Sequence, residues 1–300
     1  MYETIIVGAG IAGLTAGIYA ARKKMSFLCL ARQFGGQTLE SGEILNYPGF
    51  TKTNGFEFNE RLREQARFNE IPLHEGEEVT RLEKRRGTFL VISDRGEYET
   101  KSVILATGAR AKRLHVPGEE RLANRGVTYC AICDGPLFAG RQVAVIGGGD
   151  SALEAADFLM HIARKIYILT INDRFLAHRY LIDMVTGQEK VVPIYQASTT
   201  AILGERVVEA VEYMQHGERK MLPVEGVFVE IGRSPNTEFV RDFVNFDEHN
   251  HILIDCETRT SVRGVFAAGD CSSIHEYQYV IAAGQGCTAL LKVAKYLQEV

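Results

Sequence analysis

Two glycine-rich segments constrain the fold of this 300-residue chain more than any other feature. The first, at residues 8–13, reads Gly-Ala-Gly-Ile-Ala-Gly, and the second, at residues 147–152, reads Gly-Gly-Gly-Asp-Ser-Ala. Each follows a run of β-branched residues and precedes an alanine-rich run, which is the strand–turn–helix context of a dinucleotide-binding βαβ unit. A unit that occurs twice indicates two nucleotide-binding domains of similar architecture.

The first segment has the glycine spacing of a phosphate-binding turn. Gly8 makes the tight turn, Gly10 lets the backbone approach a pyrophosphate, and Gly13 lets the helix pack closely on the strand. The helix N-terminus, which contains Ala12, then stabilises the phosphate charge. An acidic residue that binds a ribose hydroxyl is expected about 20 residues further on, but residues 28–32 contain none, so another group must hold that ribose. The alternative is an ordinary glycine turn of an α/β protein.

The second segment keeps most of this spacing. Gly147 and Gly149 take the turn and phosphate positions, and Ala152 replaces the last glycine while still permitting close packing. The helix begins with Asp150 and Ser151. We therefore predict that these five residues bind a second nucleotide. The alternative is a retained fold that no longer binds one.

Hydrophobic patterning gives the order of helices and strands. The expected helices are 11–22, 56–69, 151–161 and 278–297, and the expected strands are 4–7, 25–30, 88–93, 98–102, 103–106, 143–146, 166–170, 208–214 and 226–230. The fold class is therefore α/β, with two Rossmann-like three-layer nucleotide-binding domains. The simplest wiring inserts the second domain into the first. Residues 1–112 and 241–300 then form one discontinuous domain, and residues 113–240 form the other.

A pair of cysteines, Cys130 and Cys133, lies between the two glycine-rich segments. Three interpretations are open: a zinc site, two structural cysteines, or a redox dithiol. A zinc site needs two further ligands at comparable spacing, and the other cysteines include no second pair, so no metal site is expected. The Cys-x-x-Cys spacing lowers one thiol pKa and closes a small disulfide, which favours redox chemistry. Asp134 follows directly and is either a proton donor and acceptor for the thiols or a residue of a turn or helix cap.

The bulk composition limits the setting of this chemistry. A net charge of −4 gives no support for nucleic-acid binding. No stretch approaches the roughly 18 consecutive apolar residues of a membrane span, and the first residues lack the segments of a signal peptide. Six cysteines spread thinly over the chain do not form the disulfide framework of a secreted protein. We therefore expect a cytoplasmic protein that binds neither nucleic acid nor membrane.

Further motifs give the chain a close resemblance to the low-molecular-weight thioredoxin reductase family, nearly from end to end. The segments that carry it are 8–13, 35–37, 46–49, 106–109, 130–135, 147–152, 232–237 and 264–270. The resemblance implies FAD in the first domain, a pyridine nucleotide in the second, a homodimer, and a large domain rotation between two half-reactions. The missing ribose-binding acid is normal for this family.

The resemblance also implies roles for individual residues near the cysteines. Cys133 would face the flavin, and Cys130 would attack the disulfide of a partner protein. Asp134 would protonate and deprotonate the thiols.

The FAD contacts are implied in the same way. Gly269 and Asp270 would bind the ribityl-phosphate side of the cofactor. The other contacts that the motifs imply are Gly36, Gln37, Asn46, Thr107, Gly108, Gln278 and Tyr279. The Arg-Gln pair of the family reads Tyr277-Gln278 here, so the contact beside the flavin ring is altered.

The chain departs from the family where the second nucleotide would be recognised. NADPH-dependent members carry His-Arg-Arg after the strand that corresponds to 166–170, with a further arginine four positions on, and these cations clamp the 2′-phosphate. The aligned residues here are Thr-Ile-Asn at 170–172 and Leu176, none of which is basic. Arg174 and Arg179 are near in sequence and are candidates to replace the clamp. The donor is therefore open among NADH, NADPH, a deazaflavin and a ferredoxin, and the intact second glycine-rich segment favours a nucleotide.

The sequence thus predicts a flavoprotein disulfide reductase. Electrons would pass from the donor to FAD, then to the Cys130–Cys133 dithiol, and then to the disulfide of thioredoxin or a thioredoxin-like protein. Two alternatives stay open. One is a flavin-dependent dithiol oxidase that passes electrons to oxygen, and the other is a flavin- or nucleotide-binding redox sensor without enzymatic turnover.

Overall fold

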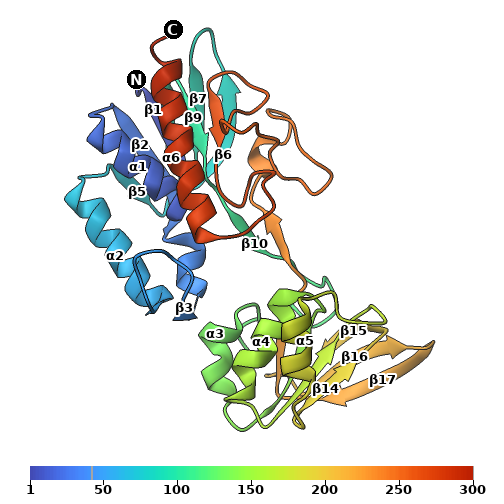
Figure 1. Ribbon diagram of the computed structural model, residues 1–300. Coiled ribbons are helices and arrows are strands. Elements are labelled where there is room, and N and C mark those ends of the chain that lie inside the picture. The colour runs from blue at the N-terminus through green and yellow to red at the C-terminus, as the bar shows by residue number, and fades with distance from the viewer. Residues whose placement is uncertain (42, 300) are drawn as a thin grey trace. The chain divides into compact units, whose positions relative to one another are not determined.

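Residues 1–110 and 234–300 of the computed structural model form one compact unit, unit 1, and residues 111–233 form a second, unit 2 (Figure 1). The structure describes residues 1–41 and 43–299, except for the side chains of residues 40, 43 and 133. The Cys133 thiol, which the sequence assigns to the dithiol, therefore lies outside the described part of the chain. None of the described helices is both long and apolar enough to cross a membrane.

Unit 1 contains a five-stranded parallel sheet in the order β20-β9-β1-β2-β5. Its central strand β1 (Thr4–Ala9) pairs with β2 (Phe27–Phe34) on one side and with β9 (Val103–Leu105) on the other. The outer strands are β5 (Leu73–Glu75) and β20 (Val265–Ala267). Because the chain leaves β1 in one direction and later returns to its other side, the topological switch point lies at β1.

Helices cover one face of this sheet, and an antiparallel ribbon covers the other (Figure 1). Helices α1 (Ile11–Arg22) and α6 (Tyr279–Tyr296) pack with Ile6 of β1, whereas the ribbon packs with Ile5 and Val7. Successive residues of a strand point to opposite faces, so β1 contributes to both layers of the core. The ribbon consists of β6 (Val79–Lys84), β7 (Phe89–Ser93) and β8 (Glu97–Thr100).

Unit 2 repeats this architecture. Its parallel sheet has the order β11-β18-β12-β13-β14, with β12 (Gln142–Ile146) in the central position that β1 takes in unit 1. Helices α4 (Asp150–Met160) and α5 (Arg179–Thr186) cover the face that carries Val143 and Val145. The other strands are β11 (Val127–Thr128), β13 (Lys165–Leu169), β14 (Val191–Ile194), β18 (Gly226–Val229), and the ribbon β15 (Ala197–Leu203), β16 (Ala210–Gln215) and β17 (Glu218–Pro223).

Shorter elements complete the described chain, together with the helix α2 (Gly55–Phe68). They are η1 (Gly36–Glu40), β3 (Glu43–Ile44), β4 (Thr53–Asn54), β10 (Ala109–Ala111), α3 (Ala131–Asp134), η2 (Gly135–Phe138), β19 (Arg233–Pro235) and η3 (Glu238–Val240). The architecture confirms the predicted α/β fold with two Rossmann-like domains.

The division between the units differs from the sequence-based boundaries. The sequence predicts crossings after residues 112 and 240, whereas the units divide after Arg110 and before Ser234. The segment after β19 packs on unit 1, which explains the larger difference. The Asn236 side-chain amide donates a hydrogen bond to the Thr107 carbonyl oxygen (2.9 Å), and Val240 is buried in the unit 1 core.

Candidate active site

A cavity of about 850 Å³ opens at the carboxyl edge of the unit 1 sheet. Its described lining residues all belong to unit 1, and most lie at or just beyond the carboxyl ends of β1, β2, β5, β9 and β20. Open α/β sheets bind ligands at this edge, next to the switch point. The fold therefore places a nucleotide site here.

The first glycine-rich turn forms part of the cavity wall. Gly8 has a φ of +112°, and a Cβ on it would lie 2.2 Å from the Ala106 carbonyl oxygen. A Cβ on Gly13 would lie 1.9 Å from the Gly8 carbonyl oxygen, so a larger residue would push α1 away from β1. Around Gly10, by contrast, the nearest described atom to an added Cβ is the Gly35 carbonyl oxygen, at 3.9 Å. Gly8 and Gly13 thus hold the turn together, and Gly10 keeps the cavity clear.

Helix α1 presents its N-terminus to this cavity. Gly10 is the N-cap residue, and the described first turn contains no acidic residue and no side-chain cap. Gly10, Ile11 and Ala12 all line the cavity. The unpaired N–H groups and the positive end of the helix dipole favour an anion at this position. These residues fit the pyrophosphate of a dinucleotide.

The cavity extends to both sides of this turn. On the side of β2 and β5 it is lined by Arg32, Gln33 and residues 77–80. On the side of β9 and β20 it is lined by residues 106–110 and 268–270. A dinucleotide carries a bulky group on each side of its pyrophosphate, so a cavity with two arms fits FAD.

On the β20 side, side chains from distant segments meet. The Gln37 side-chain amide donates to the Asp270 carboxylate (2.6 Å), 233 residues away in sequence, and to the Ala109 carbonyl oxygen (3.2 Å). The Tyr279 hydroxyl donates to the Gln37 carbonyl oxygen (3.0 Å) and is also hydrogen-bonded to the Ser41 hydroxyl. These contacts fix the first residue of α6 against η1 at the cavity wall.

Most of the FAD contacts that the sequence predicts line this cavity. They are Gly8, Gly10, Ala12, Gly36, Gln37, Thr107, Gly108, Gly269, Asp270 and Tyr279. Three others do not line it. Gly13 packs behind the turn, and the Asn46 side-chain amide donates to Gln278 (3.1 Å).

Sequence reasoning missed the residues of the β2 and β5 arm. Glu77 is buried there and accepts hydrogen bonds from the Ser93 and Tyr98 hydroxyl groups. Burial alone would raise the pKa of the Glu77 carboxyl, but these bonds and a contact with His74 outweigh burial and lower it. Glu77 therefore anchors the arm as an ionised group, and Arg32 adds a cationic side chain to the lining of the same arm. Their position in the sequence could have indicated Arg32 and Glu77, because each lies at or beyond the carboxyl end of a parallel strand.

Cys130 lies in unit 2, between β11 and α3. It is half-buried and disulfide-bonded, whereas the other cysteines with described side chains, at positions 29, 256, 271 and 287, are free. The Cys130 N–H donates to the Thr128 hydroxyl oxygen (3.2 Å), and that hydroxyl donates to the Asp134 carboxylate. Asp134 makes no described side-chain cap on η2. Thr128 therefore holds the Asp134 carboxylate next to the Cys130 backbone.

The second glycine-rich turn begins α4 in a different electrostatic setting. Asp150 lies in the first helical turn, where it accepts the backbone N–H of His178 (2.7 Å), and its other oxygen lies 2.8 Å from Nδ1 of His178. These contacts hold the pKa of the Asp150 carboxyl below its ordinary value. Unlike the N-terminus of α1, the N-terminus of α4 thus already carries a paired negative charge.

The packing of this turn resembles that of the first. A Cβ on Gly147 would lie 2.0 Å from the Glu230 carbonyl oxygen, and Ala152 is fully buried under the turn. Gly149 is the N-cap residue of α4, and Ser151 in the first turn is exposed. The five predicted residues are therefore brought together in one turn.

The segment after β13 folds onto this turn. The Leu176 N–H donates to the Gly148 carbonyl oxygen (2.7 Å), and Thr170 is buried against Gly148. Of the two candidate arginines for a phosphate clamp, Arg179 forms an ion pair with Asp183 (2.9 Å). The other, Arg174, is exposed.

Known proteins are similar to this chain over nearly its whole length. The pattern of the pyridine nucleotide-disulphide oxidoreductase family matches residues 2–286. The chain is 37% identical to NADH dehydrogenase of Bacillus subtilis (strain 168), 38% identical to a subunit of the alkyl hydroperoxide reductase of Staphylococcus aureus (strain MSSA476), and 39% identical to thioredoxin reductase of Mycolicibacterium smegmatis. The first two matches each cover 99% of the chain, but only 58% and 59% of the relatives. The match to thioredoxin reductase covers 100% of the chain and 97% of that relative. The chain therefore spans little more than half the length of the first two.

Solved structures of thioredoxin reductases are also similar to this chain. Thioredoxin reductase of Lactococcus lactis, in its FR conformation, matches with a TM-score of 0.93 and 34% identity over 100% of both chains. A ferredoxin-flavin thioredoxin reductase from Clostridium acetobutylicum matches with a TM-score of 0.55 and 27% identity over 100% of this chain and 99% of that one.

Proposed function

We propose, since this chain belongs to the pyridine nucleotide-disulphide oxidoreductase family, that it reduces the disulfide of thioredoxin or a thioredoxin-like protein. The observation that carries the proposal is the presence in one chain of a two-armed dinucleotide cavity and a disulfide-bonded Cys130. The names of the Mycolicibacterium smegmatis relative and of the Lactococcus lactis structure, both thioredoxin reductases, support a thioredoxin-like target.

FAD, when bound, would supply two-electron redox chemistry at the cavity, and the chain would supply position. The N-terminus of α1, with Gly10 and Ala12, would hold the pyrophosphate. Asp270, oriented by Gln37, would bind the ribityl side. Arg32 would contact the adenosine side, where the ribose-binding acid of other dinucleotide sites is missing.

Two electrons and two protons would reduce the Cys130–Cys133 disulfide to two thiols. The Cys130 thiolate would then attack one sulfur of the target disulfide, which forms a mixed disulfide and releases the other target sulfur as a thiolate. Attack by Cys133 on the Cys130 sulfur would release the second target thiolate and restore the internal disulfide. Asp134, held in place by Thr128, would take the thiol proton and return it to a departing thiolate.

We further propose NADH as the donor. Cationic side chains bind a 2′-phosphate through charge-assisted hydrogen bonds, but the residues after β13 present Thr170, Ile171 and Leu176 instead. Arg179 is paired with Asp183, and ionised Asp150 adds negative charge at the N-terminus of α4. The name of the Bacillus subtilis relative, NADH dehydrogenase, agrees with this choice.

We expect kcat/KM for NADH to be at least as high as that for NADPH, because the residues after β13 do not offer the charge-assisted phosphate contact that favours NADPH elsewhere, which is worth roughly 1.5–3 kcal/mol or about tenfold or more in affinity. Anaerobic stopped-flow measurement of flavin bleaching with each nucleotide, and with reduced ferredoxin, checks this. Arg174→Ala should leave the ratio unchanged. A preference for NADPH that Arg174→Ala abolishes would contradict the proposal and show a rebuilt clamp. Rapid bleaching by reduced ferredoxin alone would exclude a nucleotide donor.

Protein purified from cells with ample flavin should carry FAD, because the cavity has an arm on each side of the phosphate-binding turn and a dinucleotide occupies both arms. Chromatography of the cofactor released by denaturation identifies it. A release of FMN, or a colourless protein that does not take up added FAD, would contradict the assignment of this cavity.

A further inference from the structure

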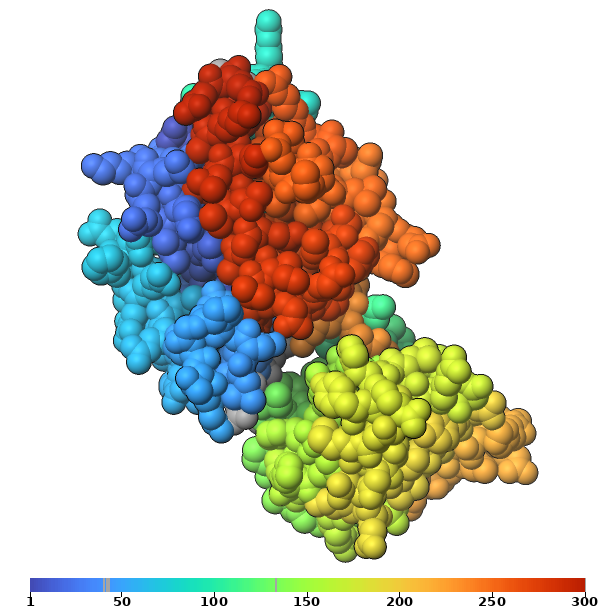
Figure 2. Space-filling view, in the orientation of Figure 1, coloured from blue at the N-terminus to red at the C-terminus, as the bar shows by residue number. Residues whose placement is uncertain are grey.

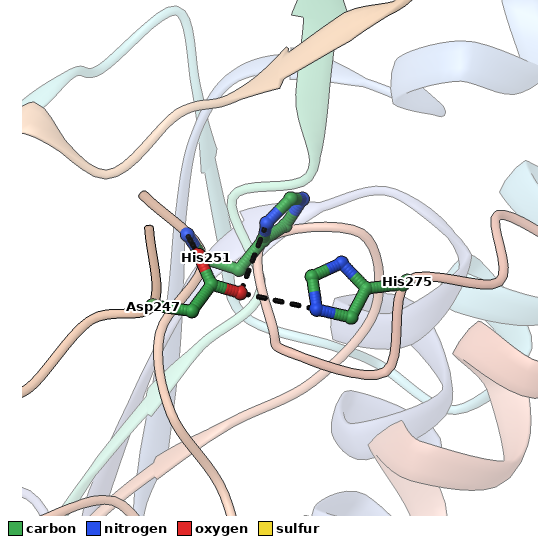
Figure 3. A group of neighbouring side chains, drawn as sticks. All are labelled: Asp247, His251 and His275. Carbon is green, nitrogen blue, oxygen red and sulfur yellow. Dashed lines mark hydrogen bonds and ion pairs between the residues drawn. The ribbon is translucent and has the colours of Figure 1, made fainter. Parts of the chain in front are cut away.

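A separate cluster of metal-ligating side chains lies in unit 1. Asp247, His251 and His275 each offer one ligand atom, and these atoms all lie within 4.8 Å of one another. Asp247 and His251 belong to the segment between η3 and β20, and His275 belongs to the segment between β20 and α6. Figure 3 shows that both imidazole rings direct a nitrogen at the same Asp247 oxygen. None of the three lines the cavity.

The distances in this cluster match those around a tetrahedral metal ion. Asp247 Oδ2 lies 3.3 Å from His251 Nδ1 and 3.1 Å from His275 Nε2. Zinc binds imidazole nitrogen and carboxylate oxygen at about 2.0–2.2 Å, which places neighbouring ligands of a tetrahedron about 3.3 Å apart. The Asp247 oxygen therefore lies at ligand spacing from both imidazole nitrogens, and all three atoms lie within 4.8 Å of one another.

Two of the ligand atoms are buried and lack a well-formed hydrogen bond. His251 is 4% exposed, and its Nδ1 meets Asp247 Oδ2 only as an ion-pair contact, since neither atom makes a hydrogen bond of good geometry with any described group. Buried polar atoms are nearly always hydrogen-bonded, so this contact requires an explanation. A bound cation between the two atoms would satisfy both.

Neighbouring hydrogen bonds orient these atoms. Asp247 Oδ1 accepts the backbone N–H groups of His249 (2.8 Å) and His251 (2.9 Å), which leaves Oδ2 for a ligand role. His251 Nε2 lies 2.7 Å from the Tyr277 hydroxyl oxygen. In the tautomer with the proton on Nε2, this N–H donates a hydrogen bond to the Tyr277 hydroxyl oxygen, and the lone pair of Nδ1 is directed at the cluster. Such outer-shell hydrogen bonds are typical of metal-binding histidines.

We propose that Asp247, His251 and His275 bind one Zn²⁺ ion per chain, with water as the fourth ligand. Two neutral imidazoles and one carboxylate suit zinc, which binds such donors more tightly than Fe²⁺ does. The His275 side chain is 46% exposed and provides access from solvent. The sequence-based expectation of no metal site considered only ligands close to Cys130 and Cys133 or in a second cysteine pair, and Asp247, His251 and His275 lie in segments without such a pattern.

An ion at this position would join two surface segments of unit 1. In Figure 2 the orange segments that precede α6 lie at the surface beside this red helix. The segment that carries His275 runs from Asp270 to Tyr279, and both of these residues line the cavity. The zinc site would therefore brace one wall of the cavity.

Zinc titration of the oxidised, FAD-loaded protein tests this inference. After treatment with a chelator and desalting, we expect calorimetry to show one Zn²⁺ per chain and the melting temperature to rise with zinc. X-ray absorption at the zinc edge should show nitrogen and oxygen ligands only. His275→Gln should lower the affinity more than a hundredfold and remove the thermal shift, while the zinc-free protein melts as the wild type does. Tyr277→Phe should lower the affinity about tenfold.

His249→Gln is the matched control, because His249 lies in the same loop without being one of the three ligands. It should leave zinc affinity unchanged, and a large loss would overturn the assigned ligand set. Zinc binding with unchanged affinity in His275→Gln would overturn the site. So would sulfur in the zinc shell, since that would point to an exposed thiol such as Cys256. Iron in place of zinc in the protein as isolated would overturn the choice of metal.

Discussion

Cys130→Ser should lower the rate of thioredoxin reduction by on the order of a thousandfold or more, as is usual when a nucleophile is removed. A serine hydroxyl neither forms the mixed disulfide nor closes the internal one. Bleaching of the flavin by the donor should stay at the wild-type rate, because the cavity belongs to unit 1. Steady-state assays with oxidised thioredoxin and single-turnover flavin measurements separate the two effects.

Cys256→Ser is the matched control for this prediction. Cys256 is an exposed free thiol, and its loss should leave both rates unchanged. Cys29 and Cys271 are unsuitable controls because both are buried in the core, where burial raises the pKa of the Cys29 thiol to about 12.

Cys133→Ser tests the division of roles between the two cysteines. It should trap Cys130 in a stable mixed disulfide with the target, visible as an added mass that a reductant removes. Substantial thioredoxin turnover by Cys130→Ser would contradict the assignment. Trapping by Cys130→Ser instead of Cys133→Ser would reverse the two roles.

The parts of the fold that the sequence predicts well are those with local physical requirements. Gly8 and Gly147 adopt positive φ values and lie against carbonyl oxygens of neighbouring strands, so the glycines are needed where they stand. The run of β-branched residues at 4–7 predicts a strand buried on both faces, and Ile5 and Ile6 are indeed buried on opposite faces of β1. The sequence predicts the turn at residues 147–152, at the start of α4, for the same reason.

The end of β2 shows where local reasoning stops. The sequence predicts a strand that ends at residue 30, whereas β2 continues to Phe34, which pairs with Ala9. Arg32 and Gln33 are polar because they line the cavity, and this composition conceals the strand. Residues that are polar because they line a ligand cavity thus hide the hydrophobic pattern of the strand on which they lie.

Pairs of residues that meet only through tertiary contacts could not be predicted from the sequence. His178 meets Asp150 only because the segment after β13 folds back onto the start of α4. Asp247 and His275 likewise meet only because two segments without hydrophobic periodicity come together in the fold. Neither pair has a characteristic spacing, so no motif could have identified it.

Gly10→Ala should lower the affinity for FAD by about 5- to 150-fold without destabilising the protein that lacks FAD. Nothing described lies closer than 3.9 Å to an added Cβ, and Gly10 has a φ of −74°, which alanine adopts readily. The methyl group would instead occupy the cavity beside the N-terminus of α1, where the pyrophosphate is to lie. Overpacking by one or two carbon atoms costs typically 1–3 kcal/mol, which corresponds to this range of affinities.

Two other glycines make this prediction specific to the cavity. Gly284→Ala in α6 adds a methyl group with no described atom within 4 Å, so FAD affinity should stay unchanged and stability should rise slightly, by about 0.5–1 kcal/mol. Gly13→Ala should lower both FAD affinity and the stability of the apoprotein, because its Cβ would collide with the backbone of Gly8. Fluorescence titration of the apoproteins with FAD and their thermal melts measure both quantities. Wild-type FAD affinity in Gly10→Ala would show that the pyrophosphate does not lie at this turn, and the cavity assignment would fail with it.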